Sequence, residues 1–309
     1  MKKIEIVLPC YNEEGNIHAL YERLCVVVAE LPQYSFSFLF VDNDSEDGTV
    51  AVIRGLSKKD DRVRAIVNAR NFGFVRSPFH GLLQAEGDAA VLMATDLQDP
   101  PELLEDLARE WERGFAVVLG QKIASKESRF MFGLRSIFYH LVARFSEIPL
   151  LKHVTGFGLY DRTALEIFRQ LNDPYPYTRG LVTEVGLPHT TVSFQQAARK
   201  RGFTKFNFLG LYDLAMLAFT SYARLPIRLA TISGFLMSIA ALVLACVFTV
   251  CKVLFWDEFP AGYASIFVSI LFFASVQIFL LGFACEYIFA ILTHVKSRPH
   301  VIERERIGF

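Results

Sequence analysis

The sequence predicts an α/β protein with a doubly wound, mostly parallel sheet, followed by a C-terminal two-helix transmembrane hairpin. Short apolar runs alternate with helix-like segments over residues 1–119, which is the pattern of strand–helix–strand units in a parallel sheet. Two stretches without charge follow, at 229–251 and 259–285. Each could supply the roughly 20 apolar residues that span a bilayer core.

The elements follow from these runs in order. The apolar segments 4–9, 36–41, 63–67, 89–93 and 116–119 predict buried strands. Helices are expected between them at 12–31, 47–57, 75–85 and 101–113. Asn12 suits the N-cap of the first helix, Glu13 and Glu14 favour its first turn, and Pro101 suits the start of the last helix.

Composition excludes several classes of protein. Lysine plus arginine equals aspartate plus glutamate, at 32 each, so no overall field points to nucleic acid. The five cysteines form no CxxC pattern, which argues against a disulfide framework or a zinc site. The first apolar run is too short and interrupted for a signal peptide, so we expect the soluble domain in the cytoplasm.

Charges at the ends of the uncharged stretches predict the topology. Asp257 and Glu258 lie in the short connection, whereas both outer flanks are basic. Basic flanks favour the cytoplasmic side, so both ends should face inward. The alternative is a pair of helices buried in a soluble protein. The basic residues are Arg224 and Arg228 before the first stretch, and Lys296, Arg298, Arg304 and Arg306 after the second.

This organisation divides the chain into four parts. We expect a cytoplasmic domain at 1–205 and an interfacial amphipathic segment at 206–228, which is apolar and aromatic with few charges. Two transmembrane helices should occupy 229–292, and a cytoplasmic basic tail should follow at 293–309.

Polar segments follow four of the predicted strands, where ligands bind in sheets of this class. Three of these segments carry carboxylates and one carries an arginine, which suits Mg²⁺ or Mn²⁺ together with a nucleotide diphosphate. A single acidic turn is more often a helix cap or a solvated loop. Glycine-rich phosphate loops are absent, which argues against dinucleotide and P-loop sites. The segments read Pro9-Cys10-Tyr11-Asn12-Glu13-Glu14, Asp42-Asn43-Asp44-Ser45-Glu46-Asp47-Gly48-Thr49, Asn68-Ala69-Arg70-Asn71-Phe72-Gly73 and Asp96-Leu97-Gln98-Asp99-Pro100-Pro101-Glu102.

On these motifs the chain resembles the family 2 glycosyltransferases of the GT-A fold, over essentially its whole length. Within that family it is similar to the polyprenyl-phosphate glycosyltransferases, which include dolichyl-phosphate mannose synthases and the bactoprenol glucosyltransferases of O-antigen modification. The motif at 96–102 is the most specific, and Gly282 to Tyr287 with Arg298-Pro299 resemble the end of the bactoprenol enzymes' membrane anchor.

The resemblance implies roles for particular residues. Asp96, Arg129 and Lys205 would be catalytic, with Asp96 and Gln98 as metal ligands. The nucleotide sugar would bind Pro9, Tyr11, Glu13, Asp42, Asp44, Arg70, Arg135 and Arg199, with Asp42 and Glu13 at the base or ribose. The basic residues could instead anchor the chain to a membrane surface.

Two departures from the family pattern stand out. The metal motif normally reads Asp-x-Asp, and here its first position is Ala94. Losing that carboxylate should weaken the metal site without abolishing it, because the donor diphosphate supplies oxygens. A general base is not assigned from the segment around Gly156, and a phosphate acceptor, already anionic, does not require one.

The implied activity is inverting transfer of a sugar from a nucleotide sugar, with UDP-glucose as the expected donor, to undecaprenyl phosphate. The expected place is the cytoplasmic face of the bacterial inner membrane, in a multi-pass protein whose homo-oligomeric state is left open. The alternative is a catalytically degenerate, membrane-anchored protein that binds nucleotide sugar or acts as a scaffold. A processive polysaccharide synthase is disfavoured, because two spans are too few for a polymer channel.

Overall fold

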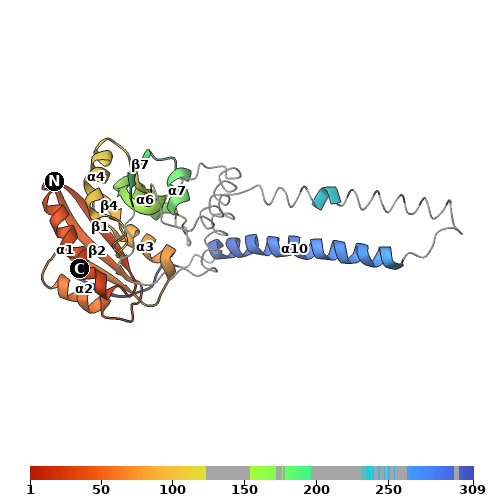
Figure 1. The fold of residues 1–309 in the computed structure, drawn as a ribbon, viewed down its shortest axis with the longest axis horizontal. Coiled ribbons are helices and arrows are strands. Elements are labelled where there is room, and N and C mark those ends of the chain that lie inside the picture. Colours follow the sequence, from red (N-terminus) through yellow and green to blue (C-terminus); the bar gives the residue numbers. More distant parts are fainter. Residues whose placement is uncertain are drawn as a thin grey trace.

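The computed structural model describes residues 1–122, 154–171, 176, 178–195, 263–295 and 299–309, with scattered positions between 232 and 254. Its helices and strands build one mixed sheet with helices on both faces, from which the long helix α10 projects (Figure 1). The strands are β1 (Lys2–Cys10), β2 (Tyr34–Asp42), β3 (Val63–Asn68), β4 (Ala89–Leu92), β5 (Val117–Lys122), β6 (Val154–Asp161), β7 (His189–Phe194) and β8 (Glu303–Ile307). The helices are α1 (Glu14–Ala29), α2 (Thr49–Ser57), α3 (Gly73–Gln84), η1 (Pro101–Leu103), α4 (Leu104–Glu112), α6 (Arg162–Leu171), α7 (Thr178–Glu184) and α10 (Tyr263–Val295).

The sheet has eight strands in the order β7-β5-β6-β4-β1-β2-β3-β8. The four central strands β4, β1, β2 and β3 run parallel, as expected from the sequence. The edge strand β7 also pairs parallel with β5, so four of the seven described strand pairings are parallel, as expected. Three pairings are antiparallel: β6 with β4, β6 with β5, and β8 with β3. The result is a mixed sheet with a parallel centre.

Alternating apolar residues of the central strands build a separate core on each face of the sheet. On β1, Ile4, Ile6 and Leu8 belong to one core and Val7 to the other. Period-two alternation places successive side chains on opposite faces, so a strand apolar at every position must be covered on both sides. Helices α1, α2 and α4 pack on the first core and α3, α6 and α7 on the second.

Helix α3 approaches the sheet very closely. A Cβ atom on Gly81 would lie 2.6 Å from Cγ2 of Val41 and 2.7 Å from Cγ1 of Val7. The absence of a side chain at this position therefore lets the helix lie directly on β1 and β2. This contact sets the position of the first turn of α3, which starts at the end of the sheet where the polar segments gather.

The strands and helices predicted over residues 1–119 are all present, but several of their ends differ. The first helix begins at Glu14 and not at Asn12, whose backbone lies in the left-handed region with φ of 53°. Asn12 does not cap its own helix, because its side chain accepts a hydrogen bond from the Glu46 backbone. The predicted helix at 101–113 is divided into η1 and α4. The sequence analysis did not identify β6, β7 and β8.

Strand β8 corrects the prediction that the C-terminal segment is a basic tail. Residues 303–307, which the sequence placed in a basic tail, form the edge strand beside β3. Their sequence Glu303-Arg304-Glu305-Arg306 alternates in charge, and charged side chains protect an exposed sheet edge from pairing with other chains. The soluble domain is therefore completed by residues that follow the predicted hairpin.

Most of the predicted membrane region lies outside the described residues, including nearly all of 206–262. Helix α10 covers 33 residues and includes most of the second uncharged stretch. Over the positions that the structure describes, no helix is long and apolar enough to cross a membrane. The two-helix transmembrane hairpin stays a prediction.

One charged residue is fully buried in the centre of the sheet. Glu5 of β1 is inaccessible to solvent, and its Oε1 lies 2.5 Å from Nη2 of Arg64 on β3. The same oxygen accepts a hydrogen bond from Ser37 Oγ at 3.3 Å, and Oε2 accepts one from the Glu86 backbone N–H at 2.7 Å. The burial of this carboxylate is thus compensated by a cation and by two further donors.

We therefore expect Glu5→Gln to destabilise the fold strongly, since it removes the buried counter-charge of the Arg64 guanidinium and leaves that group paired with the exposed Glu86. Breaking a buried ion pair costs about 3–5 kcal/mol. The exposed pair of Arg162 and Glu166 offers a control, because Arg162→Gln should cost less than about 1 kcal/mol. Thermal unfolding of the two purified variants measures the difference, and equal unfolding temperatures would contradict this account of Glu5.

Candidate functional site

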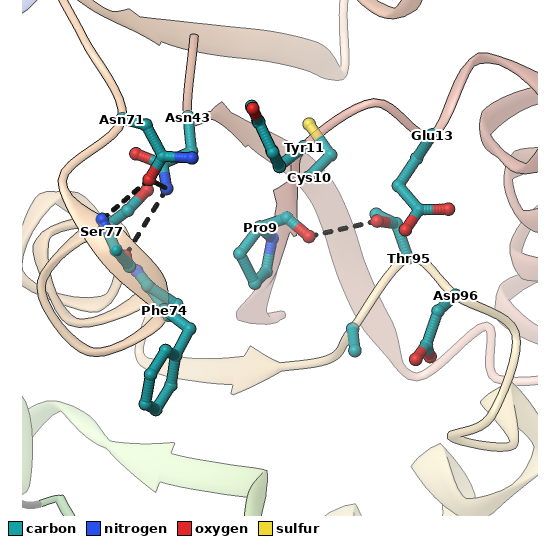
Figure 2. A pocket seen from close by; sticks show the side chains of 13 residues that line it. Pro9, Cys10, Tyr11, Glu13, Asn43, Asn71, Phe74, Ser77, Thr95 and Asp96 are labelled. Atoms are coloured by element: carbon teal, nitrogen blue, oxygen red, sulfur yellow. Dashed lines mark hydrogen bonds between the residues drawn. The ribbon is translucent and has the colours of Figure 1, made fainter. Parts of the chain in front are cut away.

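A cavity of about 590 Å³ opens at the carboxyl ends of β1, β2 and β4 and beside the first turn of α3. This is the end of the sheet where the sequence predicted a ligand site. Figure 2 shows polar side chains from all four of the predicted segments around it. The lining residues are Pro9, Cys10, Tyr11, Glu13, Asn43, Asn71, Gly73, Phe74, Ser77, Pro78, Ala94, Thr95 and Asp96.

The loops after β1 and β2 are joined by side chain to backbone hydrogen bonds. The Asn12 N–H donates to Ser45 Oγ at 2.9 Å, and Asn12 Oδ1 accepts from the Glu46 N–H at 2.8 Å. The Glu13 N–H donates to Thr49 Oγ1 at 2.9 Å. Short polar side chains in these positions satisfy backbone groups that regular structure leaves unpaired. The two loops therefore hold each other in place and present Tyr11 and Glu13 to the cavity.

Asn43 connects the second loop to the third. Its Nδ2 donates to Asn71 Oδ1 at 2.8 Å, and its Oδ1 accepts from Asn68 Nδ2 at 3.0 Å and from the Phe72 N–H at 2.9 Å. Asn68 in turn donates to Ser77 Oγ on α3 at 3.0 Å. Asn43, Asn71 and Ser77 lie together on one side of the cavity (Figure 2). A rigid, amide-rich wall results, with hydrogen-bonding groups of the kind that recognise polar ligands.

The wall on the other side comes from the segment after β4. Thr95 Oγ1 donates to the Pro9 carbonyl at 3.0 Å, which ties this segment to the loop after β1. The Gln98 N–H donates to Asp96 Oδ1 at 3.2 Å and helps to orient that carboxylate. In Figure 2, Asp96 and Glu13 lie on the side of the cavity opposite Asn71 and Ser77. The cavity thus has a neutral amide wall and an acidic wall.

A second carboxylate of the same segment is buried beneath the acidic wall. Asp99 is 6% exposed, and its Oδ2 accepts a hydrogen bond from the Ala94 N–H at 3.2 Å. Burial raises the pKa of Asp99 to about 6, and the nearby charge of Asp96 acts in the same direction. Asp99 therefore supports the backbone at Ala94, whereas Asp96 is the carboxylate that reaches the cavity.

The acidic wall fits a divalent cation that arrives with a diphosphate. The described part of the chain contains no group of three or more His, Cys, Asp or Glu residues that could hold a metal by itself. Mg²⁺, however, is commonly held by one or two carboxylates together with substrate phosphates and water. Asp96 and Glu13 provide such carboxylates on the cavity surface, and Glu13 is oriented by a hydrogen bond from Asn16 Nδ2 at 2.6 Å.

Four of the predicted site residues, Pro9, Tyr11, Glu13 and Asp96, line the cavity. Asp42 does not. It is fully buried, and its carboxylate accepts hydrogen bonds from Ser45 N–H and Oγ. In this structure Asp42 therefore holds the loop and is absent from the lining of this cavity.

The remaining predicted residues lie elsewhere. Asp44 is turned toward the C-terminal strand, with its Oδ1 2.9 Å from Nη1 of Arg304. Arg70 is exposed and lies over the Phe72 ring, with 4.2 Å between its Cζ and the ring centroid. Gln98 contributes its backbone N–H to Asp96 and is absent from the cavity lining. The predicted residues Arg129, Arg135, Arg199 and Lys205 fall outside the described residues.

Several lining residues were not selected from the sequence, namely Asn43, Asn71, Phe74, Ser77 and Thr95. Asn43 and Asn71 belong to two of the predicted polar segments, but only charged residues of those two segments were expected to bind the donor. Phe74 and Ser77 lie three positions apart on α3, so the same face of its first turn meets the cavity. That face could be recognised only once the closeness of α3 to the sheet was known.

Comparisons with known proteins identify the family of the chain. Residues 5–168 match the family described as Glycosyl transferase family 2. The chain is 33% identical over 304 residues to an uncharacterized glycosyltransferase, YkcC, of Bacillus subtilis (strain 168), covering 98% of this chain and 94% of that protein. It is 32% identical over 309 residues to a bactoprenol glucosyl transferase derived from the SfII prophage in Shigella flexneri, covering 99% of each. A solved structure, mannosyl-3-phosphoglycerate synthase from Rubrobacter xylanophilus, is similar with a TM-score of 0.45 and 15% identity over 75% of both chains.

The family match covers the strands and loops that build the cavity, and the sequence identity to relatives above 30% extends along the chain. The chain therefore belongs to glycosyl transferase family 2 and is a glycosyltransferase.

Proposed function

We propose that this enzyme transfers a sugar, with inversion, from a nucleotide sugar to a polyprenyl phosphate. The observation that carries the proposal is 32% identity over 99% of the chain to an enzyme named bactoprenol glucosyl transferase. That relative aligns over both the cavity-forming domain and the apolar C-terminal region. UDP-glucose is the proposed donor, and undecaprenyl phosphate the proposed acceptor.

The two walls of the cavity suit the two parts of a nucleotide sugar. Asn43 uses its amide to hold Asn71 at the cavity, where the Asn71 amide could meet a base or ribose, and Tyr11 adds an aromatic surface. The carboxylates of Asp96 and Glu13 lie across the cavity. They would repel a bare diphosphate, so a cation must accompany that part of the donor.

The proposed cation is Mg²⁺ or Mn²⁺, held by Asp96 with support from Glu13. When bound, it would stabilise the negative charge that develops on the departing nucleoside diphosphate. The Gln98 N–H orients Asp96 for this role, and the Thr95 hydrogen bond to Pro9 fixes the distance between the two strand ends. Related enzymes carry a carboxylate at the position of Ala94. In this chain the Ala94 side chain offers no ligand, and the Ala94 N–H donates a hydrogen bond to Asp99 that supports the backbone there.

The proposed reaction is a single displacement. A phosphate oxygen of the acceptor attacks the anomeric carbon, the bond from that carbon to the β-phosphate oxygen breaks, and the nucleoside diphosphate leaves with the electron pair. A phosphate monoester is largely dianionic at pH 7, since its second pKa is about 6. The chain therefore does not need to remove a proton from the nucleophile.

The proposed acceptor requires contact with a lipid surface. Large apolar side chains of α10 are exposed, among them Ile270 at 60%, Ile278 at 71% and Leu281 at 66%. Extended exposed apolar surface of this kind is typical of membrane or partner contact. We propose that this region anchors the enzyme to the cytoplasmic face of the inner membrane, where the phosphate of a polyprenyl lipid meets the cavity.

A non-catalytic role is the second candidate. Ala94 replaces a carboxylate of the usual metal motif, and a protein that binds nucleotide sugar without turnover would tolerate that change. In the catalytic candidate the acidic wall is needed for sugar transfer. In the non-catalytic candidate it is needed only for binding the nucleotide sugar.

Asp96→Asn decides between them. We expect this variant to lose about 10²-fold or more of its turnover, because the carboxylate that would hold the cation is gone. Asp106→Asn is the control, since Asp106 lies on α4 and pairs with Arg109 at the surface. The assay follows sugar transfer to undecaprenyl phosphate in membranes. Full turnover of the Asp96 variant, or of the unaltered enzyme in excess EDTA, would contradict the metal-dependent mechanism.

The amide wall is tested by Asn43→Ala. The variant removes the group that joins Asn71, Asn68 and the Phe72 N–H, and we expect nucleoside diphosphate to bind about tenfold more weakly. Calorimetry with UDP and Mn²⁺ measures the affinity. Gln84→Ala removes an amide at the far end of α3, where it contacts Arg306, and should leave the affinity unchanged. Equal affinities in the two variants would show that Asn43 does not form the donor site.

The membrane requirement is tested by replacing 229–292 with a flexible glycine–serine linker, which keeps β8. This variant should still bind UDP and transfer sugar to a short, water-soluble polyprenyl phosphate. It should lose transfer to undecaprenyl phosphate in membranes, because a long polyprenyl tail stays in the bilayer. Unchanged transfer to the membrane-embedded lipid would show that the anchor is not required.

A further inference from the structure

The segment that follows α10 returns to the donor end of the sheet. Residues 299–307 form a continuous series of contacts with the sheet edge and the neighbouring helices. The Arg76 guanidinium donates to the Pro299 carbonyl at 2.6 Å, the Ala69 N–H donates to the Ile302 carbonyl at 2.8 Å, and His80 Nε2 lies 2.8 Å from Glu303 Oε1. Arg54 pairs with Glu305, and Arg304 pairs with Asp44.

These contacts end on different parts of the molecule. Arg54 lies in α2, so its pair with Glu305 joins two surface elements. Arg304 instead reaches into the loop between β2 and α2, where its Nη1 lies 2.9 Å from Asp44 Oδ1. Asp44 stands between Asn43, which lines the cavity, and Ser45, which accepts a hydrogen bond from Asn12. Among the described ion pairs of β8, the pair of Arg304 and Asp44 reaches the loop between β2 and α2, which lines the cavity through Asn43.

The backbone at Asp44 needs such support. Its φ is 66°, in the left-handed region that costs a non-glycine residue roughly 1 kcal/mol or more. Aspartate tolerates the conformation better than most residues. The conformation reverses the chain so that Asn43 turns toward Asn68 and Asn71 while Ser45 turns toward Asn12. If this turn relaxed, both connections would move together.

We infer that Arg304 is a positioning residue for the donor cavity, which it holds in shape through Asp44. The inference rests on the proposed binding of a nucleotide donor in that cavity. It assigns the strand after the predicted hairpin a part in donor binding, although no residue of β8 lines the cavity. This ion pair would thus be one of the contacts through which the segment after α10 reaches the loops of the donor cavity.

The solvent exposure of the two paired side chains predicts how much the ion pair contributes to donor affinity. The side chains of Arg304 and Asp44 are 51% and 34% exposed, so the ion pair contributes little to global stability. Its removal should therefore appear in the loop and in donor affinity, and leave the core unchanged. An exposed pair of this kind corresponds to a change of about two- to fivefold in an equilibrium constant.

The test uses the full chain in detergent micelles and two matched variants, Arg304→Gln and Arg54→Gln. Each removes one arginine from an ion pair with the 303–305 region, and only the first pair reaches the cavity loop. Amide hydrogen exchange is measured without nucleotide over 43–49 and over β1 as a reference. Binding of UDP with Mn²⁺, and KM and kcat for the donor sugar, are measured in parallel.

We expect Arg304→Gln to speed exchange at 43–49 at least threefold, with exchange in β1 unchanged. UDP should bind about two- to fivefold more weakly, and donor KM should rise with kcat unchanged, because the loss affects ground state and transition state equally. Arg304→Lys keeps the charge and should recover most of the affinity. Arg54→Gln should match the unaltered enzyme in every one of these measurements.

A double-mutant cycle tests whether the effect passes through Asp44. Asp44→Asn keeps a residue that tolerates the left-handed conformation, so its main change is loss of the charge. Adding Arg304→Gln to Asp44→Asn should cause no further loss of affinity, since the two residues act as one unit. Additive losses, or equal exchange at 43–49 in Arg304→Gln and Arg54→Gln, would overturn the inference.

The outcomes separate this inference from the proposed function. Failure of the unaltered enzyme to bind any of UDP, GDP, ADP, CDP or dTDP would refute the proposed donor site. The exchange measurement needs no ligand, so in that case it still decides whether Arg304 orders the loop. Binding in the unaltered enzyme with no change in Arg304→Gln would refute the positioning role alone.

Discussion

The interlocking of the loops at one end of the sheet is the constraint on which the site depends. Asn12, Ser45 and Thr49 join the first two loops, and Asn43 joins the second to the third. Each bond pairs a short polar side chain with a backbone or amide group that would otherwise be left without a partner. Three loops that would move independently therefore behave as one surface. A preformed surface reduces the conformational cost of binding a ligand.

The sheet makes this interlocking possible because β1, β2 and β3 end at nearly the same level. The β1 strand pairs in register with β2 along its whole length, from Lys2 opposite Tyr34 to Cys10 opposite Asp42. Both strands are buried on both faces, and a shift of one residue would exchange the two cores. The register that the cores enforce places Asn12 opposite the turn at Ser45. Core packing thus determines loop contacts that involve no apolar residue.

The acidic wall shows how environment separates two neighbouring carboxylates. Asp96 reaches the cavity, and Asp99 is buried beneath it and supports the Ala94 N–H. Burial raises the pKa of Asp99 to about 6, so this group carries a charge less readily than an exposed aspartate does. The segment therefore keeps one carboxylate for the cavity and uses the other for its own conformation. This arrangement is compatible with the loss of a carboxylate at position 94.

The central strands, the helices between them and the polar segments that meet in the cavity could all be predicted from the sequence. These follow from local patterns of apolar residues, caps and turns, which do not depend on distant contacts. The sequence also indicated Pro9, Tyr11, Glu13 and Asp96, because residues directly after buried strands lie at the ligand end of a parallel sheet. The family and its activity were likewise indicated by the motifs.

Which residues of those segments face the cavity could not be recognised from local patterns. Asp42 and Asn43 are adjacent, yet the first is buried beneath the loop, where it accepts hydrogen bonds from Ser45, and the second lines the cavity, where it bonds to Asn68 and Asn71 of the next loop. Strand β8 could not be recognised either. Its alternating charges resemble a solvated tail, and it becomes a strand because β3 offers it a free edge. A contact between positions 44 and 304 depends on the path of the whole chain, and no local pattern encodes it.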